Sequence, residues 1–128
     1  MIDKNENILK NVKFLERAGI LLEIQFDLCC NEKTRSVLTI LKEAPNVTVI
    51  INHAGYPPIS HVPDQKNAIH SSENSKDTKN HMDVWKLNLA LFAQQPNCYI
   101  KCSGFEMFRR DYTKQHVVEV IKILNELF

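Results

Sequence analysis

The sequence lacks the features that would place it in a specialised class of protein. It has only three glycines in 128 residues, a net charge of +1 from 16 basic and 15 acidic residues, and no apolar run approaching the ~20 residues that span a bilayer. Nucleic acid and anionic membranes are therefore poor candidate partners, because both require a basic surface. Charged residues interrupt the first twelve positions, so no secretory signal is predicted and a cytoplasmic location is expected.

The chain also lacks a cysteine spacing suited to cross-links, although it contains four cysteines. Cys29 and Cys30 are adjacent, while Cys98 and Cys102 are four positions apart in a predicted strand. Residues four apart in a strand are separated by roughly 13 Å, too far for a disulfide or a shared metal ion. Four reduced thiols are expected.

What the sequence does contain is an alternation of helical and strand patterns. Apolar residues at helical spacing predict helices over about 5–17, over 32–43, around Met82 to Phe92, and from Thr113 onward. Alternating or β-branched stretches predict strands over 20–28, 47–52 and 98–103, and the polar, proline-containing stretch 57–80 is predicted to be an insertion loop. The order predicts an α/β fold with about three parallel strands and four helices.

Two parallel architectures fit this order, and the first strand favours a barrel. Its odd positions Glu23, Gln25 and Asp27 are all polar, which suits a barrel lumen better than a face covered by helices. Lys101 in the third strand fits either a lumen or a sheet edge, because a three-stranded sheet has two edge strands. The second strand is nearly continuous in β-branched residues and is expected to be buried on both faces.

Polar residues at the strand ends predict a binding site. The three predicted strands end in Asp27, His53 and Ser103. One layer deeper lie Gln25 and Lys101. We expect this mouth to bind a small anionic or carbonyl substrate through Gln25, Asp27, Lys101 and Ser103, with Lys101 as an electrostatic clamp. His53 would serve as a metal ligand or as a general acid or base; the alternative is a histidine that only caps backbone carbonyls in the turn.

The polar insertion carries further histidines that we do not assign to a metal site. His61, His70 and His81 are nine and eleven positions apart, and such spacings in a solvated loop set no geometry. A lid or specificity loop over the mouth is the functional alternative for this stretch. The pair Arg109-Arg110 is a candidate contact for an anionic substrate, with exposed surface charge as the alternative.

Two linked motifs resemble a known family. His53-x-Gly55-x-Pro57 and Lys101-x-Ser103-Gly104, together with Phe26-Asp27-Leu28, are similar to the amidohydrolase-related family of metal-dependent hydrolases, which includes fuconolactonase-like and pyrone-dicarboxylate lactonase-like enzymes. The resemblance runs through roughly residues 8–108. It implies a TIM-like (β/α)8 barrel that hydrolyses lactones, amides or related carbonyl compounds, often with a divalent metal such as zinc or manganese. It also implies that His53 is a catalytic residue, as metal ligand or substrate contact.

Departures from the family pattern limit what the chain is expected to do alone. The family's His-x-His pair on the first strand and its strand-end aspartate are both absent, and Asn52 stands where aspartate is common. Residues 1–128 are therefore expected to be a fragment of a barrel domain with an incomplete metal-ligand set, inactive alone. A non-catalytic α/β module that binds a ligand or partner, and a truncated product without function, remain alternatives. The oligomeric state is left open.

Overall fold

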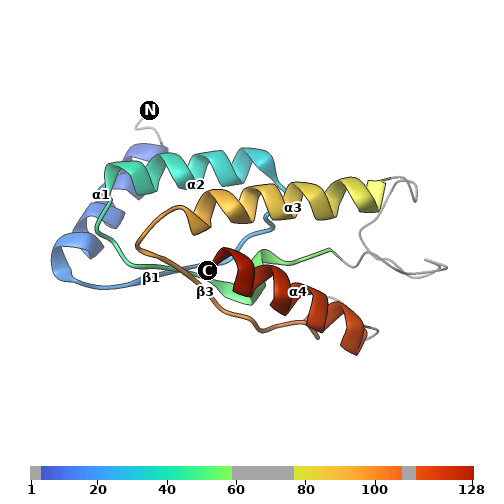
Figure 1. Cartoon of the computed structure of the whole chain (residues 1–128). Helices are drawn as coiled ribbons and strands as arrows, with labels where there is room; N and C mark the ends of the chain where they lie inside the picture. The colour runs from blue at the N-terminus through green and yellow to red at the C-terminus, as the bar shows by residue number, and fades with distance from the viewer. Residues whose placement is uncertain (1–3, 59–76, 108–111) are drawn as a thin grey trace.

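The computed structural model describes residues 4–58, 77–107 and 112–128 (Figure 1). Helices alternate with short strands in the order α1 (Lys4–Ala18), β1 (Leu22–Ile24), α2 (Asn31–Glu43), β2 (Val49–Ile51), a 3-10 turn η1 (Asn52–Gly55), α3 (Asp77–Ala93), β3 (Cys98–Ile100) and α4 (Lys114–Leu127). The four predicted helices and three predicted strands are confirmed. Helix α3 begins at Asp77, so the last four residues of the predicted loop are helical, and 59–76 lie outside the described residues.

The strands form one parallel sheet in the order β1-β2-β3. Leu22 pairs with Val49, which pairs with Cys98, and the two positions that follow stay in the same register. Each strand has only three residues, so the predicted strand lengths are wrong. Pairing ends early because β2 passes directly into the η1 turn, and β3 is followed by a bend in which the Ser103 N–H donates to the Lys101 carbonyl at 3.1 Å.

One face of the sheet is covered and the other is open. Neighbouring helices pack together in chain order, and residues from all four join the covered face in a single core (Figure 1). Tyr99 on the open face is 57% exposed, and Glu23, in the same row of the sheet across Ile50 of β2, is exposed too. The expected burial of both faces of 47–52 is wrong, since Thr48 is exposed and Ile50 only half-buried. No helix covers that side among the described residues.

Two buried side chains of α3 connect the core to the strand ends. Trp85 is fully buried, and its indole N–H donates to the carbonyl of Ala54 at 2.9 Å. The Asn88 amide donates to the Leu28 carbonyl at 2.7 Å and to Asn31 Oδ1 at 2.8 Å. Since a buried polar group stabilises the fold only when it is paired, these bonds fix α3 against the loops that follow β1 and β2.

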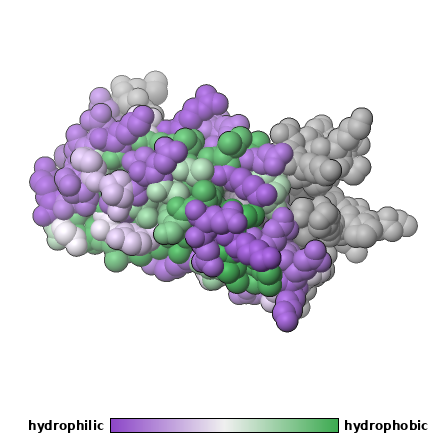
Figure 2. All heavy atoms as spheres, viewed as in Figure 1, coloured by the Kyte–Doolittle hydropathy of each residue, from purple (hydrophilic) through white to green (hydrophobic). Residues whose placement is uncertain are grey.

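The outer surface mixes polar and apolar side chains. Figure 2 shows hydrophobic patches interspersed with hydrophilic residues on the face that it displays. Leu87 and Leu91 of α3 are among the exposed apolar residues. Within the described ranges no helix is both long and apolar enough to cross a membrane.

Candidate functional site

The turn after β2 has an unusual backbone that places His53 at the end of the strand. His53, Ala54 and Tyr56 have φ angles of 55°, 51° and 59°, in the left-handed region that non-glycine residues seldom occupy. Three hydrogen bonds hold this turn: the Trp85 bond to the Ala54 carbonyl, the Ala54 N–H to the Lys101 carbonyl at 2.8 Å, and the Leu28 N–H to the Gly55 carbonyl at 3.0 Å. A strained turn fixed from three sides is typical of functional positions.

Both glycines in the family-like motifs have a steric reason to be glycine. A Cβ on Gly104 would lie 2.1 Å from His53 Nδ1, and a Cβ on Gly55 would lie 2.2 Å from Leu28 Cδ1. Both residues also have a positive φ, 72° and 63°, which glycine adopts without strain. Gly104 of the second motif therefore leaves the space that the imidazole of His53, in the first motif, occupies.

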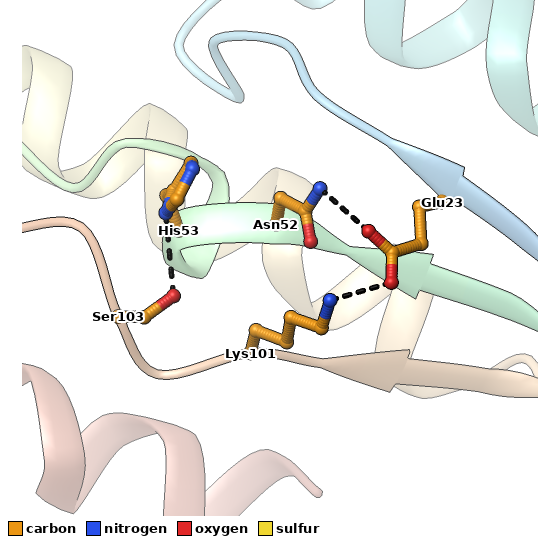
Figure 3. Close-up of polar contacts among 5 residues, drawn as sticks. All are labelled: Glu23, Asn52, His53, Lys101 and Ser103. Atoms are coloured by element: carbon orange, nitrogen blue, oxygen red, sulfur yellow. Dashed lines mark hydrogen bonds and ion pairs between the residues drawn. The ribbon is translucent and has the colours of Figure 1, made fainter.

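His53 and Ser103 make a side-chain contact between the segments that follow β2 and β3. The imidazole Nδ1 lies 3.2 Å from Ser103 Oγ, and Figure 3 shows the two side chains pointing toward one another from the segments after β2 and β3. The His53 ring stacks on Tyr56, with ring centroids 5.7 Å apart. The serine hydroxyl can pair with either tautomer, so the contact fixes the orientation of the ring and directs Nε2 away from Ser103.

A pocket of about 310 Å³ opens over this pair. It is lined by Asp27, Cys29, His53, Tyr56, Pro57, Pro58, His81, Ser103, Gly104, Phe105 and His116. The structure thus places Asp27, His53 and Ser103, the three predicted strand-end residues, around one cavity. Asp27 Oδ1 accepts the backbone N–H of Cys29 at 2.8 Å, which fixes the carboxylate at the start of the turn.

Gln25 and Lys101 are not among the residues that line this pocket. Gln25 is exposed. The Lys101 ammonium instead pairs with Glu23 Oε1 at 2.5 Å, and the Asn52 amide donates to Glu23 Oε2 at 3.2 Å (Figure 3). The Lys101 hydrogen bond, followed by that of Asn52, lowers the pKa of the Glu23 carboxyl below its ordinary value. The Lys101 charge, which was expected to bind a substrate, is therefore neutralised by the Glu23 carboxylate.

Sequence reasoning missed Glu23 and His116 as candidate site residues. Glu23 lies on the same predicted strand face as Gln25 and Asp27, and this shared periodicity could have identified it as a candidate site residue. His116, in the first turn of α4, is 6% exposed, lines the pocket and packs edge-on against Phe105, with ring centroids 6.2 Å apart. A lone histidine in an amphipathic helix gives no comparable signal.

Burial determines the protonation of His116. Its Nδ1 is buried without a hydrogen-bond partner among the described residues, and burial lowers the pKa of the imidazole although Glu119 acts in the opposite direction. The ring is also three residues into α4, close to the positive end of the helix dipole. His116 is therefore neutral at physiological pH.

Acid should destabilise the fold in two separate steps. Because the pKa of His116 is lowered from 6.5 on folding, the unfolded chain binds the extra proton, and stability is lost as pH falls through that value. The lowered pKa of Glu23 gives a second loss below 4.5. We expect urea midpoints measured from about pH 8 to about pH 3 to fall in both windows. His116→Phe should flatten only the upper window and Glu23→Gln only the lower; unchanged profiles in both variants would contradict these assignments.

Cys29 is the only thiol that lines the pocket, and its environment makes it a weak nucleophile. Burial, followed by the charge of Asp27, raises the pKa of Cys29 to about 12. A thiol must ionise to act as a nucleophile or metal ligand, so Cys29 is a packing residue. All four cysteines are free, as the sequence predicted.

The described residues do not supply a metal-binding set. Among residues 4–58, 77–107 and 112–128, no group of three His, Cys, Asp or Glu side chains is placed to hold a metal ion. A catalytic zinc site generally needs three protein ligands, and His53 Nδ1 is already bonded to Ser103. His81 is exposed at the pocket, while His61, His70, Arg109 and Arg110 lie outside the described residues. The described residues alone therefore do not fit a divalent metal ion.

The fold and the site define an α/β protein with a parallel sheet and a polar pocket at its strand ends. Sequence comparison then identifies the family. The model of the amidohydrolase family matches residues 10–126. The chain therefore belongs to the amidohydrolase family, which indicates a hydrolase with a small-molecule substrate and does not favour a non-catalytic binding module. No curated protein and no solved structure matches the chain at a significant level.

Proposed function

We propose that this chain is a hydrolase that cleaves a small lactone, amide or related carbonyl compound, and that the pocket at its strand ends is sufficient for this reaction, in contrast to the inactivity expected from its incomplete metal-ligand set. The observation that carries the proposal is the His53–Ser103 hydrogen bond over the pocket, held by a strained turn and accommodated by Gly104. Histidine is the most frequent general acid or base in enzymes, and its placement at a strand end beside a pocket fits this role.

Proton transfer at His53 accounts for the proposed reaction. We assign the ring proton to Nδ1, which donates to Ser103 Oγ and leaves a lone pair on Nε2. Nε2 takes a proton from a water molecule as its oxygen bonds to the carbonyl carbon. The imidazolium then gives a proton to the leaving oxygen or nitrogen as its bond to that carbon breaks, which yields a carboxylic acid and an alcohol or amine. Asp27 and Ser103 provide polar contacts for the substrate.

We further propose that the sheet is an arc of a TIM-like barrel. We also propose that the chain groups with the fuconolactonase-like and pyrone-dicarboxylate lactonase-like members of the family. The one-sided helix layer and the polar open face support the barrel, because helices surround the outside of such barrels and polar side chains face the lumen. Gln25 and the Glu23–Lys101 pair would lie in the lumen below the site. The four free thiols support a cytoplasmic location.

Substitution of His53 tests the catalytic proposal. His53→Asn is the sharpest variant, because asparagine tolerates the left-handed backbone and removes only the imidazole. With dihydrocoumarin as a lactone and 4-nitroacetanilide as an amide, we expect kcat/KM to fall by about 10²–10⁴-fold for whichever compound is hydrolysed.

Serine variants provide the matched control for this experiment. Ser103→Ala should lower kcat/KM because the imidazole loses its orienting partner, whereas Ser36→Ala, on the exposed surface of α2, should leave it unchanged. Hydrolysis that persists in folded His53→Asn at the wild-type rate would overturn the proposal, as would the absence of hydrolysis of either compound by the wild-type chain.

A further inference from the structure

His116 and its surroundings indicate which kind of substrate the pocket accepts. The ring belongs to α4, and it lines the same cavity as His53 although the two residues are far apart in the sequence. It is nine-tenths buried and makes no side-chain hydrogen bond to a described residue at Nδ1. A polar side chain in that state beside a cavity is typical of a group that binds a ligand.

The buried Nδ1 determines which ring nitrogen can serve a ligand. A proton on Nδ1 would place an unpaired N–H donor in the protein interior, which costs free energy. The neutral ring avoids this by keeping its lone pair on Nδ1 and its proton on Nε2. The imidazole then offers a single N–H donor, which suits a carbonyl oxygen.

The charges around the pocket exclude one class of ligand. Among the described residues, those that line it include the Asp27 carboxylate but no lysine or arginine, and the nearby Lys101 is balanced by Glu23. Pro57, Pro58 and Phe105 give the walls a largely apolar character. Binding an anion here would bring it close to Asp27 without a compensating cation from the described residues.

We propose that the pocket binds an uncharged carbonyl compound with an apolar body, and that the His116 Nε2–H donates to its carbonyl oxygen. This inference deepens the proposed function and rests on it, since it names the substrate class of the same site. It replaces the anionic alternative that Lys101 suggested in the sequence. His116 is a specificity-determining residue, whereas His53 transfers the proton.

A pair of probes that differ by one carboxylate group tests the substrate class. Coumarin and coumarin-3-carboxylate share one bicyclic ring, and their affinities for the wild-type chain can be measured by NMR titration. We expect coumarin to bind about tenfold more tightly, because its analogue brings a carboxylate next to Asp27. Tighter binding of the carboxylate, or no binding of either probe, would overturn the proposal. This comparison requires no substitution and so does not depend on a variant folding.

Variants of His116 test the hydrogen bond separately. His116→Phe fills the same space without a donor and should weaken coumarin binding by about three- to tenfold, whereas His116→Gln, which keeps an N–H near the Nε2 position, should restore it. Val118→Ala on the exposed side of the same helix should leave affinity unchanged. Equal weakening in folded His116→Phe and His116→Gln would indicate a structural role and overturn the assignment.

The binding and hydrolysis readouts separate the two proposals. A chain that binds coumarin through His116 but hydrolyses neither dihydrocoumarin nor 4-nitroacetanilide would contradict only the proposed hydrolase function. A chain that hydrolyses one of them with dependence on His53, yet binds neither coumarin probe, would contradict only the substrate class inferred from His116.

Discussion

Replacing Trp85 by alanine is expected to lower the free energy of unfolding by about 3–5 kcal/mol, the range for removing a large aromatic side chain from a core. Trp85 is fully buried, and its indole N–H satisfies the carbonyl of the buried residue Ala54. The substitution therefore creates a cavity and removes one of the hydrogen bonds that hold the His53 turn. Because domains are stable by only about 5–15 kcal/mol, the loss should be visible as a large shift of the urea midpoint measured by far-UV circular dichroism.

Two further substitutions in α3 separate the packing contribution from the hydrogen bond. Trp85→Phe keeps an aromatic ring but leaves the Ala54 carbonyl unpaired, so we expect a smaller loss of about 1–3 kcal/mol. Leu87→Ala is the matched control, since Leu87 is 69% exposed on the same helix and should change stability by no more than about 0.5 kcal/mol. A Trp85→Ala loss as small as that of Leu87→Ala would contradict the role of Trp85 as the centre of the core.

Replacing Gly104 by alanine should displace the His53 imidazole and abolish most of the activity. The new Cβ would lie 2.1 Å from Nδ1, so the ring must leave its bond with Ser103. We expect kcat/KM for lactone hydrolysis to fall by about 10²–10⁴-fold, approaching that of His53→Asn. The ring ¹⁵N resonances of His53 should shift even without substrate, which gives a readout independent of turnover.

Gly19→Ala provides the control for backbone strain. Gly19 has a φ of 65°, close to that of Gly104, but its Cβ would meet no atom within 4 Å. Both variants should therefore lose about 1–2 kcal/mol from the positive φ, and Gly104→Ala should lose about a further 1–3 kcal/mol from the clash. Similar stability and similar His53 resonances in the two variants would show that Gly104 is not required for the placement of the imidazole.

The sequence by itself determined the order of the elements and the alternation of side chains along the first strand. The alternation over 20–28 placed Ile24 and Leu28 on one face and Gln25 on the opposite face, because side chains along an extended chain point in alternate directions. In the structure Leu28 is buried, Ile24 half-buried and Gln25 exposed. The alternation of strands and helices also predicted that Asp27, His53 and Ser103 would lie close together, since parallel strands end at one edge of a sheet. Both inferences rest on local periodicity, which a sequence displays directly.

The tertiary structure decided which polar side chains meet. Lys101 and Glu23 are 78 positions apart, and their pairing depends on the order of the strands and on the conformation of two flexible side chains. His116 reaches the pocket only because α4 packs beside α3. The left-handed turn at His53 depends in the same way on Trp85 and on the space left by Gly104. Such contacts follow from distances between remote parts of the chain, and local sequence patterns do not encode those distances.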